Sequence, residues 1–300
     1  MARTIETYST AERGAHGDFW IRNESRMPLA EHAHRHEFFQ IQFNVEGRTR
    51  HYIGPAERWL EPGSLAFVLP YRVHLGGRPA GSRFYVVNFE QRFLFPELNV
   101  DPLELENVPV AQAPLLAPFL FQDSVDFVLK DADLEMAQDA CAKMMAEHER
   151  RQLFSRDIIR ANLTLLIGTV CERYEKQLAV AAGHARRSYH TRTLARVMRY
   201  VRENLSGRIT LEQAARAANL SPNYLTNLLK HETGKTFTSL VTSRRMEKAR
   251  ELLTYTSLRV SEIADATGFQ DEAYFARRFK QYFRVSPIAY RSREAPAALR

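Results

Sequence analysis

The spacing of apolar residues changes along the chain and predicts strands in the first part and helices in the second. Between residues 18 and 110, aromatic and β-branched runs such as EFFQIQFNV and SRFYVVNFE are separated by turns rich in glycine and proline. From about residue 123 the chain has helical character, and two long helices are expected within 123–178. A small, polar and basic stretch at 179–192 is typical of a linker, and helices with short turns follow over 193–293. The pattern predicts an α+β protein of two domains, 1–178 and 193–293.

Histidines gather on one face of a predicted strand. Alternation places one set of side chains together, namely His34, His36, Phe38, Gln40 and Gln42. The opposite face would carry Phe39, Ile41, Phe43 and Val45. The segment HAHRHEFFQIQFNVEG resembles the first cupin motif, with Gln40 where that motif has glutamate. PGSLAFVLPYRVH resembles the second motif, with His74 in the histidine position and two spacings one residue off. The resemblance implies a cupin-like barrel over about 18–110 with the histidine face inside.

Two segments of the C-terminal part share one pattern. LEQAARAANLSPNYLTNLLK (211–230) aligns with VSEIADATGFQDEAYFARRFK (260–280) at an offset of 49 before the turn and 50 after it. Each copy has small residues in a first helix, a turn residue that tolerates the left-handed conformation (Asn219 or Gly268), and a second helix. This is the pattern of a helix-turn-helix unit, and its repetition is a much stronger signal than a single copy.

A segment without proline or glycine connects the two copies. Residues 237–256 predict one continuous helix. At ~1.5 Å per residue, about 18 residues span roughly 27 Å. Successive major-groove faces of DNA are ~34 Å apart, so a helix of this length can hold two recognition helices in adjacent grooves. A plain helical bundle is the alternative.

The outer sides of the two predicted recognition helices carry side chains that can contact bases. The candidate DNA-binding residues are Asn223, Thr226, Asn227, Lys230, Glu272, Ala273, Ala276, Arg277 and Lys280. Arg277 aligns with Asn227 in the repeat, and we expect it to bind guanine. The residues expected to bind phosphate or stay solvated are Arg244, Arg245, Lys235, Arg278 and Lys280. The buried sides are expected to hold Tyr224, Leu225, Leu228 and Leu229 in the first helix and Tyr274, Phe275 and Phe279 in the second.

Charge is distributed unevenly along the chain. Residues 184–300 contain 22 Lys and Arg against 10 Asp and Glu, a balance of +12, whereas residues 1–183 contain 20 against 25, a balance of −5. A basic domain on a mildly acidic body indicates a polyanionic partner such as nucleic acid. The chain has no run of eighteen apolar residues and no apolar signal core, and Cys141 and Cys171 form no metal pattern. We therefore expect a cytoplasmic protein that does not contact membranes.

Four segments complete the picture of the C-terminal part. SPNYLTNLLKHETGKTF, SRRMEKARELL, EIADATGF and FARRFKQYFRVSPIAYR follow one another within 193–291. In order and spacing they resemble the signature segments of the AraC/XylS family of transcription regulators. The resemblance implies a seven-helix DNA-binding domain and an effector-binding, cupin-like barrel with dimerisation helices. It also implies a homodimeric activator that binds promoter DNA, responds to a small molecule and works with RNA polymerase. Arg284 departs from the family pattern, which has glycine there.

The second long helix carries an apolar stripe formed by Ile158, Ile159, Leu163, Leu166 and Val170. Two interpretations stand side by side. The stripe either packs on the barrel or pairs two subunits, and with two helices to place both can hold.

The barrel leaves its ligand chemistry open. The candidate effector-binding residues are His34, His36, Phe38, Gln40 and His74. Carboxylate-binding candidates are Arg50, Arg72, Arg83 and Tyr85, so an aromatic carboxylate is one hypothesis for the effector. Three imidazoles and an oxygen also suit iron, manganese or zinc, which makes a metal-dependent cupin enzyme with a DNA-binding tail a rival. A regulator controlled by a protein partner is a third interpretation. Because Gln40 is neutral, we expect no metal, no cofactor and no enzymatic activity.

Overall fold

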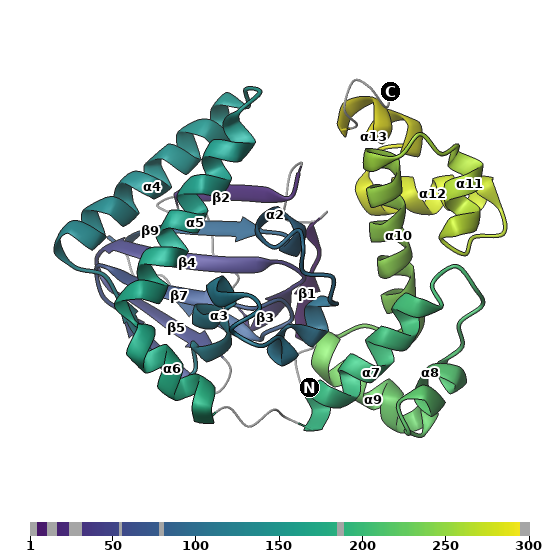
Figure 1. Ribbon diagram of the computed structural model, residues 1–300, viewed down its shortest axis with the longest axis horizontal. Helices are drawn as coiled ribbons and strands as arrows, with labels where there is room; N and C mark the ends of the chain where they lie inside the picture. Colours follow the sequence, from purple (N-terminus) through teal and green to yellow (C-terminus); the bar gives the residue numbers. More distant parts are fainter. Residues whose placement is uncertain are drawn as a thin grey trace. The chain divides into compact units, whose positions relative to one another are not determined.

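The computed structural model describes residues 5–10, 17–23, 32–53, 56–77, 81–184 and 189–294. It divides into two compact units, Met1–Ser188 and Tyr189–Arg300 (Figure 1). The segment expected to be a linker differs from expectation, because its described residues are helical. Helix α6 (Glu175–His184) and helix α7 (Tyr189–Glu203) extend into it from either side. The alanine-rich run at 179–182 has high helix propensity, which explains why α6 continues through it.

The N-terminal unit is built on two five-stranded sheets. The first has the order β1 (Glu6–Tyr8), β3 (His34–His36), β8 (His74–Gly77), β5 (Thr49–Ile53), β6 (Ala56–Leu60). The second has the order β10 (Phe127–Val128), β7 (Ser64–Val68), β4 (Phe39–Glu46), β9 (Arg83–Phe89), β2 (Phe19–Asn23). Gln42 on β4 donates to the hydroxyl of Thr49 on β5 at 3.2 Å, so the sheets face each other. A small apolar cluster from both sheets, Ile53, Leu60, Ala66 and Val68, supports the same arrangement. We call the enclosed volume the barrel interior.

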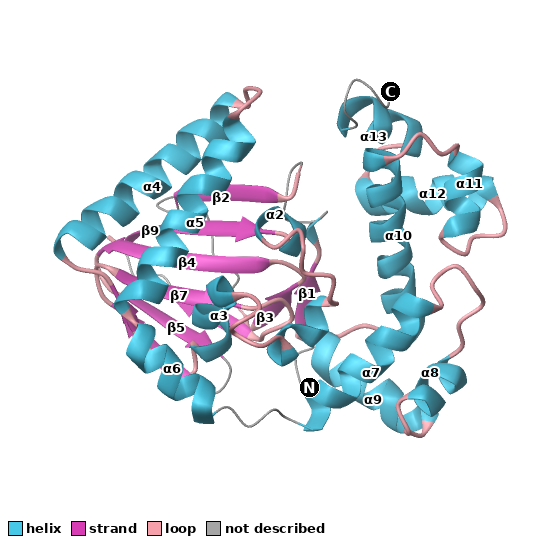
Figure 2. Ribbon diagram, in the orientation of Figure 1, coloured by secondary structure: helices cyan, strands magenta, loops and turns pink. Residues whose placement is uncertain are grey.

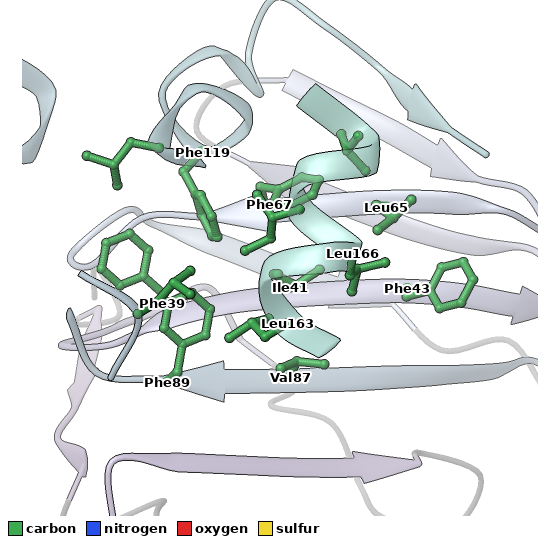
Figure 3. Packing of buried hydrophobic residues seen from close by; sticks show 14 of the residues in the cluster. Phe39, Ile41, Phe43, Leu65, Phe67, Val87, Phe89, Phe119, Leu163 and Leu166 are labelled. Carbon is green, nitrogen blue, oxygen red and sulfur yellow. The ribbon is translucent and has the colours of Figure 1, made fainter. Parts of the chain in front are cut away.

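The main hydrophobic core lies on the outer face of the second sheet rather than inside the barrel. Phe39, Ile41 and Phe43 point away from the interior and pack with Leu163 and Leu166 (Figure 3). The covering helices are α3 (Ala117–Phe121), α4 (Asp131–Arg150) and α5 (Ser155–Arg173). Shorter pieces of the unit are α2 (Gln91–Leu94), η1 (Pro102–Asn107) and η2 (Pro114–Leu116). Because alternate residues of β4 face opposite ways, Gln40 and Gln42 point into the interior.

The apolar stripe of α5 packs on the sheet over most of its length. Ile159, Leu163, Leu166 and Val170 are buried in the main core. Ile158 is exposed. The expectation that the stripe packs on the barrel is therefore confirmed for four of its five members.

The C-terminal unit is helical throughout its described residues (Figure 2). After α7 come α8 (Leu211–Ala217), α9 (Pro222–Thr233), α10 (Phe237–Tyr255), α11 (Val260–Ala266), α12 (Glu272–Phe283) and α13 (Pro287–Glu294). Helix α10 is the continuous connector that the sequence predicts between the two copies of the repeat. None of the described helices is long and apolar enough to cross a membrane.

The repeat in the sequence is also a repeat in structure. Thr210 and Gln213 form the predicted capping box at the start of α8. Ser221 and Asp271 cap α9 and α12 by accepting from the third residue of each helix. The turn residues Asn219 and Gly268 both have left-handed backbone, with φ of 58° and 76°. Two helix-turn-helix units, α8–α9 and α11–α12, therefore share one design.

Candidate nucleic-acid interface and barrel site

Each recognition helix buries one stripe of side chains and exposes the other. Helix α9 buries Leu225, Leu228 and Leu229, and α12 buries Phe275 and Phe279. The predicted base-contacting residues lie on the remaining sides. Those that are exposed are Asn223, Thr226, Asn227, Lys230, Glu272, Ala273, Arg277 and Lys280, and Ala276 is half-buried. The structure therefore leaves all nine candidates off the buried stripes.

The two tyrosines expected on the buried sides are exposed instead. Tyr224 is 40% exposed and Tyr274 is 48% exposed. Both are the third residue of their helix, and helical side chains lean toward the N-terminus. A side chain in the first turn therefore projects beyond the start of the helix. The Arg277 guanidinium lies 5.9 Å from the centre of the Tyr274 ring. The alignment of these tyrosines in the repeat was the signal that sequence reasoning could have used to add them to the candidate surface.

Several basic residues that were expected to bind phosphate have partners within the protein. Arg245 donates to the carbonyl oxygens of Leu205 and Gly207 at 3.1 and 2.6 Å. Arg244 is buried and lies 3.4 Å from the carboxylate of Glu247. The ammonium group of Lys235 donates to the hydroxyl of Ser243 at 3.2 Å. Arg245 in particular is a structural residue, because a desolvated arginine needs such acceptors.

The interior of the barrel collects the predicted effector-binding residues. The His74 ring lies 4.4 Å from the His34 ring and 4.7 Å from the His36 ring, measured between centroids. Phe38 stacks on His36 at 4.2 Å, and the Gln40 amide donates to Nε2 of His74 at 3.3 Å. The structure brings all five residues together. It also adds a fourth histidine, His51, whose ring centre is 5.8 Å from that of His74.

Backbone carbonyls set the tautomers of three of these histidines. Nδ1 of His34 lies 3.0 Å from the His32 oxygen, and Nδ1 of His36 lies 2.6 Å from the Phe38 oxygen. Nδ1 of His74 lies 3.1 Å from the oxygen of Arg72. A carbonyl oxygen only accepts, so each Nδ1 carries a proton, and Nε2 is the acceptor whenever the ring is neutral.

Burial favours the neutral form of two imidazoles of the interior, His51 and His74. It lowers the pKa of His51 to about 4, and the His34 ring adds to this effect. Burial lowers the pKa of His74 in the same direction, and the rings of His36, His34 and His51 reinforce it. Among the described residues, no group of three or more His, Cys, Asp or Glu side chains is arranged to hold a metal ion.

A row of polar side chains crosses the interior face of the second sheet. Trp20 on β2 pairs with Asn88 on β9, which pairs with Gln40 on β4. The indole N–H of Trp20 and the side-chain oxygens of Asn88 and Asn44 are buried without a hydrogen-bond partner in the described part of the chain. Both ring nitrogens of His51 are likewise buried without a hydrogen-bond partner among the described residues. Sequence reasoning missed Trp20, Asn44, His51 and Asn88, because they are separated widely along the chain.

The residues expected to bind a carboxylate lie outside the barrel. Arg50 forms an ion pair with Glu57 at 2.5 Å. Arg72 contacts Glu106 and Asp123, and Arg83 contacts Glu46. Arg50 alternates with the inward-facing His51, and Arg83 and Tyr85 share the outward face of β9 with Val87 and Phe89. The sequence alone did not show which of these four candidates point inward; strand alternation points Arg50, Arg83 and Tyr85 away from the interior, and Arg72, in the segment before β8, pairs with Glu106 and Asp123.

Two helix-turn-helix units joined to a barrel with a polar interior define a DNA-binding protein with a ligand-binding domain. Residues 26–126 match the family model of the AraC-like ligand binding domain, and residues 214–293 match that of a helix-turn-helix domain. The chain belongs to the AraC family, and it is a DNA-binding transcription regulator with a ligand-binding domain.

Three curated relatives match between about a third and a half of this chain. The Transposon Tn10 TetD protein of Escherichia coli is 34% identical over 35% of this chain and 76% of its own length. Regulatory protein PocR of Salmonella typhimurium is 32% identical over 46% of this chain and 49% of PocR. Transcriptional activator NphR of a Rhodococcus species is 35% identical over 36% of this chain and 32% of NphR. The match to PocR thus spans about half of that relative's length.

Proposed function

We propose that this regulator reads DNA with both recognition helices, α9 and α12. The observation that supports this most is the equivalence of Asn227 and Arg277, which are exposed at the same position of the two units. Asn227 suits adenine, and Arg277 suits the O6 and N7 atoms of guanine. Thr226 donates its hydroxyl to the Pro222 oxygen at 2.9 Å, so toward DNA it offers an acceptor and a methyl group.

Arg277 and its neighbour Arg278 provide a matched test of base reading. Arg277 is exposed, whereas the half-buried Arg278 donates to Gln281 on the same helix at 2.8 Å. We expect Arg277→Ala to weaken specific binding by about 1–3 kcal/mol and to relax one base position. Arg278→Ala should weaken specific and random DNA equally, as loss of a phosphate contact does. The measurement is selection of sites from random DNA by the full chain, followed by gel-shift titration. Equal losses on both DNAs for Arg277→Ala would refute its reading role.

The effector of this proposal is a neutral small molecule that donates hydrogen bonds. In the described part of the chain the interior offers acceptors without a partner, namely the side-chain oxygens of Asn44 and Asn88 and one ring nitrogen of neutral His51. The rings of Trp20 and Phe38, 4.5 Å apart, add an aromatic surface. Such a set suits hydroxyl, amide or amine groups and repels a carboxylate. Arg50, Arg72 and Arg83 pair with carboxylates of the protein itself, which also favours a neutral effector over a carboxylate.

A thermal-shift screen of the full chain tests the ligand class. Neutral polyols and amides form one panel, and aromatic carboxylates form the other. We expect stabilisation by members of the first panel, lost in Asn88→Ala but kept in Tyr52→Ala, whose side chain lies on the outward face of β5. Arg22 lies two residues after Trp20 on β2 and so shares its inward face. Stabilisation only by a carboxylate, lost in Arg22→Gln, would replace this ligand class with the aromatic carboxylate.

The proposal includes activation of transcription by a homodimer. The name of NphR, a transcriptional activator, supports activation. Exposed apolar side chains at the α4–α5 turn and along α5 support a dimer, namely Leu153, Phe154, Ile158 and Leu165. Transcription reconstituted with RNA polymerase and a selected site would rise with the protein present. A fall in transcript would make the chain a repressor.

A further inference from the structure

Arg245 sits in the middle of α10, the helix that connects the two helix-turn-helix units. Its guanidinium donates to the carbonyl oxygens of Leu205 and Gly207, in the loop between α7 and α8 that leads into the first unit. The central carbon (Cζ) of the same guanidinium lies over the Phe269 ring, 5.6 Å from its centre. Phe269 belongs to the turn of the second unit. One side chain therefore contacts both units.

Gly268, next to Phe269, shows how closely the two units approach at this point. A Cβ atom added to Gly268 would lie 2.6 Å from Nη2 of Arg245 and 2.7 Å from the backbone oxygen of Leu205. These distances are shorter than van der Waals contact. Glycine is required here by its φ of 76° and also by a packing contact with the other unit. The loop of the first unit, Arg245 and the turn of the second unit thus form one junction, and Figure 1 shows the α7–α8 and α11–α12 connections on the same side of α10.

In the second unit, Arg291 also holds a backbone segment through two carbonyl oxygens, as Arg245 does in the first unit, but it does not connect the two units. Arg291 on α13 donates to the carbonyl oxygens of Leu253 and Leu258, at the end of α10 and in the loop that leads into α11. In each unit, an arginine on the helix after the recognition helix holds the backbone before the first helix. Only for Arg245 do the contacts also reach the turn of the other unit. Arg291 is therefore a natural control for Arg245.

We propose that Arg245 is a positioning residue that locks the two helix-turn-helix units into one rigid reading surface. A continuous α10 fixes the distance between the units, and its residues Met246, Ala249 and Leu253 are buried in one hydrophobic cluster with the second unit. The freedom that remains is a tilt of the first unit against the second. The planar guanidinium binds two carbonyls and covers an aromatic ring at once, so it removes that freedom. The inference rests on the proposed reading of DNA by both α9 and α12. It adds that Arg245 sets the spacing and orientation of the two DNA subsites that α9 and α12 contact.

Hydrogen exchange of the full chain without DNA tests the junction directly. Arg245→Lys keeps the positive charge but lacks the planar guanidinium that donates to two carbonyls at once. In this variant we expect the backbone amides of 204–210 and of 267–270 both to exchange at least tenfold faster. In Arg291→Lys, faster exchange is expected only at 253–259. A general loss of stability would instead raise exchange throughout the C-terminal unit. If Arg245→Lys loosens only 204–210, the arginine serves one unit and the inference fails.

Selection of DNA sites supplies the functional readout. Wild-type protein should select two subsites at one spacing. Arg245→Lys should select the same two subsites with variable spacing, and its affinity for the wild-type spacing should fall about tenfold. Arg291→Lys should keep the fixed spacing. Fixed spacing and affinity within twofold of wild type for Arg245→Lys would overturn the inference. Failure of the wild type to select paired subsites would instead refute the proposed reading by both helices.

Discussion

Arg284 is the residue at which the second unit departs from the first. It closes α12 with φ of 64°, and Gly234 closes α9 in the same left-handed conformation with φ of 72°. A side chain in this region costs on the order of 1 kcal/mol. The departure from glycine that the sequence shows at this position therefore places a strained residue at the end of α12. The Arg284 side chain is exposed.

The strain predicts that glycine stabilises the second unit. Arg284→Gly should raise the free energy of unfolding of the C-terminal unit by about 0.5–1 kcal/mol, because relief of the strain outweighs the added freedom of the unfolded chain. Gly234→Ala is the matched control and should lower the same quantity by a similar amount. Urea unfolding followed by circular dichroism measures both. A less stable Arg284→Gly protein would show that the arginine side chain makes a stabilising contact that outweighs its backbone strain.

His51 predicts a pH dependence of the barrel. Its pKa falls from 6.5 to about 4 on burial. Between these values the unfolded chain binds a proton that the folded barrel excludes, so stability is lost as the pH falls through this window. The loss is on the order of 3 kcal/mol. Trp20 and Trp59, the chain's two tryptophans, both lie in the N-terminal unit, so their fluorescence reports its unfolding.

The measurement compares urea unfolding of the N-terminal unit at pH 7 and pH 4.5. In His51→Gln the drop in the free energy of unfolding between the two pH values should shrink, even if the variant is less stable at both. His74 has a pKa shifted in the same direction and should account for part of the remaining drop. An unchanged drop in His51→Gln would rule out His51 as a source of the pH dependence.

At the scale of elements, local sequence signals predicted the C-terminal unit well. Caps such as Ser221 and a continuous 237–256 segment depend only on neighbouring residues, and both the cap and the helix α10 are present. The role of Arg245 was not readable, because its acceptors, Leu205 and Gly207, lie about forty residues away and are backbone atoms. In the barrel, alternation along β4 correctly placed Gln40 inside. The inward partners Trp20 and Asn88 depend on strand pairing, which a single sequence does not show.

The exposed side of α5 predicts how subunits associate. Ile158 and Leu165 are seven residues apart, so they lie on one face of the helix, opposite the residues that pack on the sheet. We expect the double variant Ile158→Glu/Leu165→Glu to sediment as a monomer and wild type as a dimer, since buried carboxylates are costly at an interface. The melting temperature of the double variant should equal that of wild type when both are extrapolated to low protein concentration, where wild type is also monomeric. Val180→Glu changes an exposed apolar residue of α6 and is the control, which should remain dimeric. If the Ile158→Glu/Leu165→Glu protein is also a dimer, the interface lies elsewhere.

At the scale of the whole molecule, the two units differ in charge and in the exposure of their candidate binding residues. The basic C-terminal unit presents its base-reading candidates on exposed helix faces. The N-terminal unit instead encloses the polar groups that we propose to bind the effector between two sheets, and its main core lies on the outer face of one sheet. A ligand in that interior contacts no DNA. It affects DNA binding only by stabilising one arrangement of the full-length protein over another.

This separation leads to a reciprocal prediction. If the effector strengthens binding to a selected DNA site by some factor, then that DNA must strengthen effector binding by the same factor, with typical values of about 5–150-fold. Calorimetric titration of the effector into full-length protein with and without the DNA site measures one arm, and gel-shift titration with and without the effector measures the other. Asn88→Ala should abolish the response in both arms while leaving DNA affinity without effector within twofold of wild type. Equal effector affinity with and without DNA would separate ligand binding from regulation and favour control by another partner.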